Sequence, residues 1–114
     1  MAKSHAKTTT VKAEIWENIM PLLAAASAEI KELNKKKPDG TVGSGKIAVL
    51  NRLLSDARIV LADEPTLKYL DFLDEELLPQ YSDVTLLLSQ YLAAMTSFRS
   101  NYYGYNGNEH VWFV

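Results

Sequence analysis

The residues best suited to chemistry lie in a glycine-rich segment before the middle of the chain. The run Gly40–Lys46 (GTVGSGK) has the spacing of a phosphate-binding loop, in which a glycine, four residues, a second glycine and a lysine follow one another. Such a loop also needs a Ser or Thr after the lysine to hold magnesium, and here the next residue is Ile47, which has no side-chain oxygen. The pattern therefore predicts a flexible glycine loop rather than a nucleotide site.

A second segment, Leu61–Thr66 (LADEPT), resembles the Walker B segment of transporter-type ATPases. Walker B should end a hydrophobic strand, whereas these residues complete a helical apolar pattern that begins at Ile47. The glycine loop should also follow a buried strand, but it follows a helical pattern and the three lysines Lys35–Lys37. The chain is also too short for a P-loop domain. These features disfavour nucleotide hydrolysis.

The sequence contains no other constellation that supports catalysis or metal binding. It has no cysteine, and His5 and His110 lie near opposite ends of the chain without a partner at metal-ligand spacing. The acidic residues between Asp63 and Glu76 are typical of a solvated helical face. We therefore expect no catalytic residues, no metal, no cofactor and no enzymatic activity.

Composition limits the fold and the compartment. With 114 residues, 47% hydrophobic and 23% charged, the chain is expected to form one globular domain over residues 10–114 after a flexible N-terminal tail at 1–9. Its net charge of −2 provides no overall field that attracts nucleic acid or an anionic membrane. No secretory signal and no run of about 18 apolar residues is present, so we expect a cytoplasmic protein without a membrane partner.

Four segments have the apolar periodicity of amphipathic helices. The first spans 11–34, with Thr10 as its N-cap and Pro21 predicted to kink or break it near Met20. A mobile Lys/Gly loop at 35–45 follows, and a second helix begins at Ile47 and is expected to end between Ala62 and Pro65. A third is predicted from the cap Thr66 to Pro79, with Leu70, Leu73 and Leu77 inward.

The fourth helix is expected to start at Ser82 or Asp83 and to end at Gly104. Connections between the four helices are short, which favours antiparallel neighbours. We therefore predict an all-α fold: a small bundle of four antiparallel helices, or five if helix 1 breaks at Pro21, with an aromatic C-terminal tail. The last residues, 110–114, are the one candidate strand.

The fourth helix carries no charged residue from Val84 to Phe98. The face opposite its core stripe consists of small or uncharged residues, namely Leu86, Ser89, Ala93, Thr96, Ser97 and Ser100. One interpretation places this helix at the centre of the bundle, covered on both sides. The other places this face against a second copy or another protein, because interface cores are depleted in charge.

The C-terminal tail concentrates aromatic residues outside any helical period. Its candidate contact residues are Tyr103, Tyr105, Trp112, Phe113 and Val114. The tail can fold back onto the bundle, dock into a partner by strand addition, or stack on single-stranded nucleic acid. The acidic balance disfavours the last of these.

Taken together, these features predict a non-catalytic helical interaction module. It would bind itself, as a homodimer, or a protein partner through its fourth helix and aromatic tail. The alternative is a nucleotide- or nucleic-acid-binding protein that uses the 40–46 loop, Lys35–Lys37 and the C-terminal aromatics.

Overall fold

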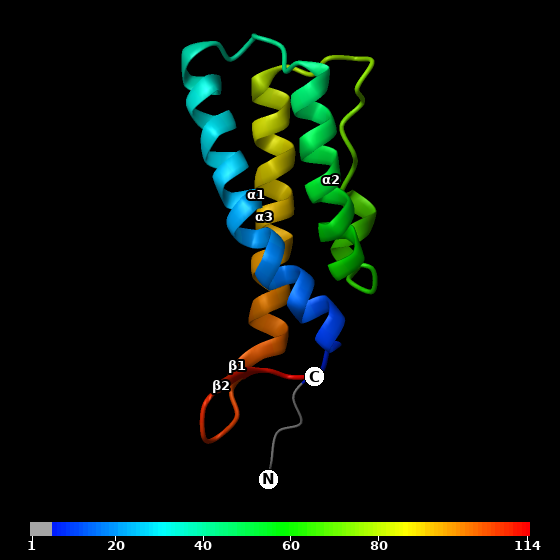
Figure 1. Ribbon diagram of the computed structural model, residues 1–114, viewed down its shortest axis with the longest axis vertical. Helices are drawn as coiled ribbons and strands as arrows, with labels where there is room; N and C mark the ends of the chain where they lie inside the picture. The colour runs from blue at the N-terminus through cyan, green and yellow to red at the C-terminus, as the bar shows by residue number, and fades with distance from the viewer. Residues whose placement is uncertain (1–5) are drawn as a thin grey trace.

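A computed structural model describes residues 6–114 and shows an elongated, mostly helical molecule of 54 × 23 × 20 Å (Figure 1). The elements are α1 Thr10–Lys36, α2 Ser44–Val60, the 3-10 helix η1 Pro65–Tyr69, α3 Tyr81–Tyr102, β1 Tyr103–Tyr105 and β2 His110–Trp112. The predicted helical fold is confirmed, but the predicted number of four or five helices is wrong. Three long helices form the bundle, and two short strands follow them.

Helix α1 is continuous through Pro21, so the alternative of a fifth helix is wrong. Pro21 lies inside the helix with its ring exposed, and the helix axis changes direction along its length (Figure 1). The N-cap is Thr9 rather than the predicted Thr10, because the Thr9 hydroxyl accepts a hydrogen bond from the backbone amide of Lys12 at 3.2 Å. The neighbouring Thr8 amide donates to the carbonyl of Phe113 at 2.8 Å. The part of the predicted flexible tail at 1–5 lies outside the described residues.

The predicted third helix does not form. Only Pro65–Tyr69 is helical, as the 3-10 helix η1, and the chain then runs mostly extended along the bundle to the start of α3 (Figure 1). Leu70 and Leu73 are buried as expected, but Leu77 is 77% exposed. Because the extended segment carries the chain back along the bundle, α3 runs parallel to α2, and both run antiparallel to α1 (Figure 1).

Side chains from other elements explain why this segment stays extended. Asn51 makes a pair of hydrogen bonds with the backbone of Leu73: its amide donates to the carbonyl at 2.8 Å, and its side-chain oxygen accepts from the backbone amide at 3.0 Å. Arg58 donates to the carbonyl of Leu70, and the Tyr91 hydroxyl donates to the carbonyl of Asp71 at 2.8 Å. These bonds satisfy backbone groups that a helix would have paired internally.

The connection between α1 and α2 is held to the segment that precedes α3. The Val42 amide donates to the carbonyl of Pro79 at 2.9 Å, and the Tyr81 amide donates to the carbonyl of Gly40 at 2.8 Å. Val42 is fully buried, and a Cβ at Gly40 would lie 3.1 Å from the Tyr81 ring. Glycine therefore fits position 40 with the least crowding, because a Cβ there would also lie 3.1 Å from the carbonyl oxygen of Lys37.

Helix α3 starts at Tyr81 with Gln80 as its N-cap, so the predicted Ser82 or Asp83 cap is wrong. The helix ends at Tyr102, and Tyr103–Tyr105 pairs antiparallel with His110–Trp112 as a hairpin. The predicted strand at 110–114 is confirmed in its first three residues, while its partner β1 was expected to be helix or tail. Gly107 takes a φ of 98° in the hairpin turn, which glycine adopts without strain.

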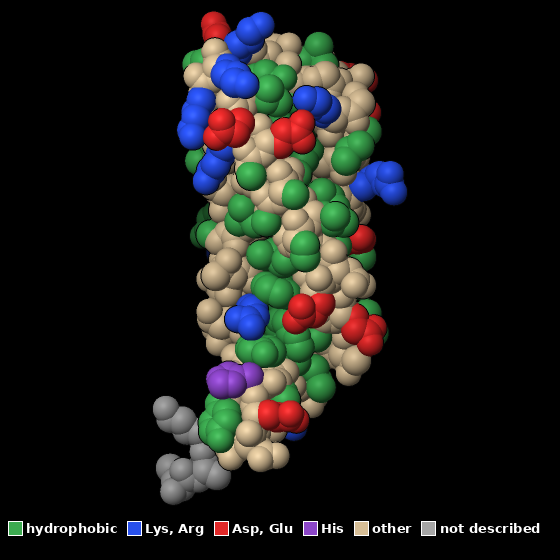
Figure 2. All heavy atoms as spheres, turned by 60° about the vertical axis from the view of Figure 1, so that its left-hand side comes forward, with side chains coloured by type: hydrophobic (Ala, Val, Ile, Leu, Met, Phe, Trp, Pro, Cys, Tyr) green, Lys and Arg blue, Asp and Glu red, His purple; other side chains and the backbone are tan. Residues whose placement is uncertain are grey.

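One continuous core joins the three helices, and its largest fully buried side chains are Tyr91 and Phe98 of α3. Helix α1 packs against both α2 and α3. Within residues 6–114, no helix combines the length and apolarity that crossing a membrane requires. Figure 2 shows basic side chains gathered at the end of the molecule where α1 ends, with hydrophobic side chains exposed farther down the same face.

Candidate protein-interaction surface

The outward face of α3 is open to solvent in the isolated chain. Six exposed residues form this face, which we call the α3 face: Leu86, Ser89, Ala93, Thr96, Ser97 and Ser100. The core residues Val84, Leu88, Tyr91, Met95 and Phe98 lie on the other side of the helix and are buried. The interpretation in which the bundle covers both sides of this helix is therefore wrong: no element of the described chain covers the α3 face.

The spacing and chemistry of the α3 face suit a second helix. Leu86, Ser89, Ala93, Thr96 and Ser100 recur at intervals of three and four residues, the repeat of a helix seam. Leu86 is 63% exposed at one end of the seam. The Ser89 hydroxyl donates to the carbonyl of Thr85 in the preceding turn at 2.9 Å, which reduces the cost of removing this hydroxyl from water.

Two shallow grooves flank the α3 face. One has a volume of about 260 Å³ and separates Ala93 and Ser97 from Thr66 and Tyr69 of η1. The other, of about 410 Å³, lies between α1 and α3 and is lined by Trp16, Glu17, Met20, Thr96, Arg99 and Ser100. A ridge of small side chains between two grooves is the surface that another helix can pack against.

The aromatic tail packs on its own chain. The Trp112 ring lies 5.4 Å from Trp16 in an edge arrangement and 6.0 Å from Phe98 of the core. Its indole N–H donates to the carboxylate of Glu17 at 3.0 Å. Phe113 lies half-buried beside Gly104, and its backbone amide donates to the carbonyl of Tyr102 at 2.7 Å. The tail therefore covers one end of the core, as the first interpretation predicted.

Arg99 joins the tail to the α3 face. Its guanidinium lies 4.0 Å from the ring centre of Tyr103 and 5.7 Å from that of Trp16, so it stacks between the hairpin and α1. The same side chain lines the groove beside Thr96 and Ser100. Tyr105 and Val114 are the exposed members of the predicted tail set, at 56% and 54%.

Comparison with known proteins gives no further guide to this surface. No protein-family model, no curated protein and no solved structure matches the chain. The function must therefore be inferred from the geometry of this chain alone.

The features of the nucleic-acid and nucleotide alternative do not form one site. Lys35–Lys37 lie at the end of α1, whereas the aromatic hairpin lies at the opposite end of the 54 Å molecule (Figure 1). Lys46 lies in the first turn of α2, 3.9 Å from the carboxylate of Glu29. The glycine loop precedes this helix but follows α1 rather than a strand.

The Walker B-like segment has structural contacts as well. Asp63 pairs with Lys12 at 2.6 Å, and the carboxylate of Glu64 accepts a hydrogen bond from the Tyr102 hydroxyl at 2.9 Å. No cluster of three or more His, Cys, Asp or Glu side chains suited to a metal occurs in residues 6–114. His5 lies outside this range, and His110 is exposed beside Tyr105.

Two tyrosines have perturbed acidity for structural reasons. Burial raises the pKa of Tyr91, whose hydroxyl donates to the carbonyl of Asp71. Burial also raises the pKa of Tyr102, and the hydrogen bond to the Glu64 carboxylate raises it further. Both hydroxyls are donors in the folded chain, so neither is placed to act as a base.

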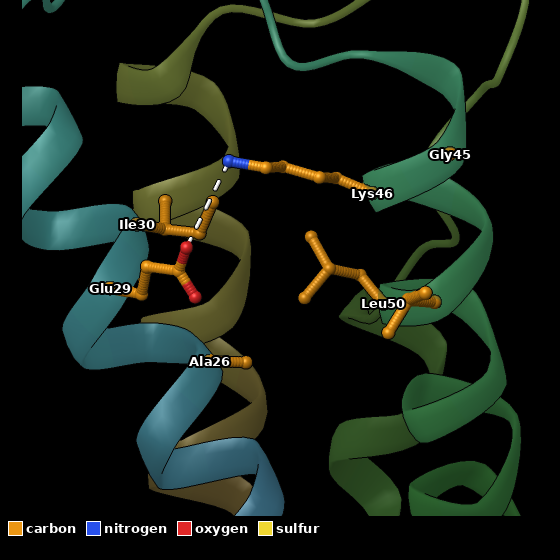
Figure 3. Close-up of a pocket in the computed structure, with 7 residues that line it drawn as sticks. Ala26, Glu29, Ile30, Gly45, Lys46 and Leu50 are labelled. Atoms are coloured by element: carbon orange, nitrogen blue, oxygen red, sulfur yellow. Dashed lines mark ion pairs between the residues drawn. The ribbon is translucent and has the colours of Figure 1, made fainter.

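The sequence did not lead us to expect another exposed surface, which lies between α1 and α2. A groove of about 620 Å³ there is bordered by Leu22 of α1 and by Val49, Arg52 and Asp56 of α2. A smaller pocket of about 260 Å³ continues it toward the start of α2, where Ala26, Ile30 and Leu50 form apolar walls (Figure 3). The order of charges along α2 is visible in the sequence, but an amphipathic pattern by itself predicts only one face toward the core and one toward solvent.

Proposed function

We propose that this protein is a non-catalytic interaction module that binds a helix of another protein, or of a second copy, along the α3 face. The observation that carries this proposal is an exposed helix face without any charged side chain between Val84 and Phe98. A solvated helix face normally carries Lys and Glu, and charge depletion is characteristic of the buried centre of interfaces. The small side chains of Ser89, Ala93 and Ser97 would let a partner helix approach closely.

The structure also suggests how the two ends of this surface would act. Leu86 would supply an apolar anchor at one end, and Arg99 would supply a charged rim at the other. The hairpin would contribute by fixing Arg99 through Tyr103, rather than by inserting into a partner as a free peptide. The hairpin has this supporting role because Trp112 already packs on the core of its own chain.

The test uses Ala93→Arg, which places a long cation at the centre of the α3 face. Because Ala93 is exposed, its replacement should change the free energy of unfolding by no more than about 0.5 kcal/mol. The unmodified chain should retain a partner protein from an extract of its source cells, and Ala93→Arg should not retain it. Ala28→Arg, at an exposed position of α1 that borders neither groove of the α3 face, is the matched control. Equal retention by both variants would refute the proposal.

A further inference from the structure

The outward face of α2 carries an ordered set of charges. Lys46 is exposed near its start, Arg52 at its middle and Asp56 in its second half, and Asp63 lies just beyond its end. Two large apolar side chains alternate with these charges: Val49 is 56% exposed and Ile59 is 48% exposed. We call the set from Val49 to Asp63 on this side the α2 face.

This order of charges is not explained by the stability of α2 itself. A helix is stabilised by acidic residues in its first turn and basic residues in its last. Arg58 in the last turn of α2 fits this rule, but Lys46 in the first turn does not. Arg52 followed four residues later by Asp56 is also the less favourable order for a pair within one helix. Within residues 6–114, Lys46 pairs with Glu29 and Asp63 pairs with Lys12, whereas Arg52 and Asp56 form no ion pair.

The pattern is complementary to itself when read in the opposite direction. If two copies of α2 lie antiparallel with their centres at residue 54, Val49 of each faces Ile59 of the other. The same register places Arg52 opposite Asp56 of the second copy. It also brings Lys46 near Asp63 of the second copy, whose carboxylate is exposed and already pairs with Lys12 of its own chain. A two-fold axis repeats each contact, so both copies use the same surface. A parallel arrangement would instead place Arg52 against Arg52.

The groove beside α2 extends this surface onto α1. Stable interfaces bury about 600–1,000 Å² on each partner, so a single helix face needs an adjoining area. Leu22 of α1 is 58% exposed across the groove from Leu53, and the small Ala25 and Ala26 lower the groove floor. At the end of the groove, the Lys46–Glu29 pair is more than half exposed, so Lys46 can exchange partners at little cost (Figure 3).

We infer that two copies of this chain associate through the α2 face, antiparallel about a two-fold axis at the level of residue 54. Val49, Ile59 and Leu22 form the apolar centre of the dimer, and reciprocal Arg52–Asp56 pairs fix its register. This inference does not rest on the proposed function, because the α3 face is not part of it.

The test is a charge reversal read by light scattering on the full chain across a range of concentrations. Arg52→Asp and Asp56→Arg should each raise the dimer dissociation constant at least tenfold, because each places like charges opposite each other twice. The double variant Arg52→Asp/Asp56→Arg should restore the dimer. An equimolar mixture of the two single variants should also form a dimer, because each variant then supplies the charge that the other lacks.

Two controls separate this contact from folding and from the α3 face. Lys31→Asp makes the same change of charge on the opposite side of α1 and should leave the dimer intact, and circular dichroism should show native helix content in every variant. Ala93→Arg should also remain dimeric.

A monomer at all concentrations, single variants as dimeric as the parent, or a double variant that stays monomeric would each overturn the inference. Loss of the dimer in Ala93→Arg alone would assign self-association to the α3 face instead.

Discussion

The packing of Trp112 predicts that a single substitution near the C-terminus destabilises the whole bundle. Removing a tryptophan from a fully enclosed core costs about 3–5 kcal/mol. Trp112 is half-buried, but its ring contacts Trp16, Tyr103 and Phe98, and each aromatic pair contributes about 0.5–1.5 kcal/mol beyond the buried area. We therefore expect Trp112→Ala to lower the free energy of unfolding by about 2–3 kcal/mol. For a domain of this size that corresponds to a decrease in Tm of roughly 10 °C.

Urea and thermal denaturation followed by circular dichroism measure this change. Trp112→Phe keeps most of the packing and loses the bond to Glu17, so we expect a decrease of about 1 kcal/mol. Tyr105→Ala, in the same hairpin but with an exposed ring, is the matched control and should change stability by less than about 0.5 kcal/mol. If Trp112→Ala and truncation of residues 111–114 both leave Tm within 2 °C of the parent, the tail does not pack on the core and the reasoning is refuted.

Two further predictions concern the contacts that hold the segment before α3 and the C-terminal end of α3. Asn51→Ala should lower the free energy of unfolding by about 1–3 kcal/mol, because it leaves the amide and carbonyl of Leu73 unpaired. Urea denaturation measures this change, and Asn101→Ala, at an exposed site, should leave the free energy of unfolding unchanged. Stability should fall as pH rises above 10.0. Tyr91 and Tyr102 lose their protons there in the unfolded chain, whereas their raised pKa values retain the protons in the folded chain. Tyr102→Phe should reduce that fall, and a pH profile identical to that of the parent would contradict this account.

The sequence predicted the elements whose apolar pattern persists over many turns. Helices α1, α2 and α3 each bury residues at intervals of three and four along their length, so the pattern has one structural solution. The segment from Thr66 to Pro79 has only three leucines in such a pattern, and two of them are also buried in its extended form. The extended form is favoured by Asn51 and Tyr91, which are distant in sequence and hydrogen-bond to the backbone of this segment. The residues of the segment itself do not reveal these partners, because the partners lie elsewhere in the sequence.

The composition of the α3 face could be predicted from the sequence, but its exposure to solvent could not. The absence of charge from Val84 to Phe98 is visible in the sequence, and it identified the six residues of the α3 face correctly as one side of a helix. Whether that side is covered depends on how many helices surround α3. Because the third predicted helix is mostly an extended segment, the bundle has too few helices to cover this side of α3.

The two exposed faces have incompatible chemistry, and this incompatibility would keep their contacts separate. The α3 face offers only uncharged side chains, so it cannot pair with Arg52 or Asp56. Docking of an α2 face onto an α3 face would remove these charges from water without partners, at a cost of several kcal/mol for each buried ion. An α2 face pressed against its own copy satisfies both charges, and an α3 face pressed against an uncharged helix leaves none unpaired. Helix α1, which packs against both α2 and α3, lets one chain present both faces. A dimer formed through α2 would therefore leave two α3 faces open, and it would bind two partner helices for each pair of chains.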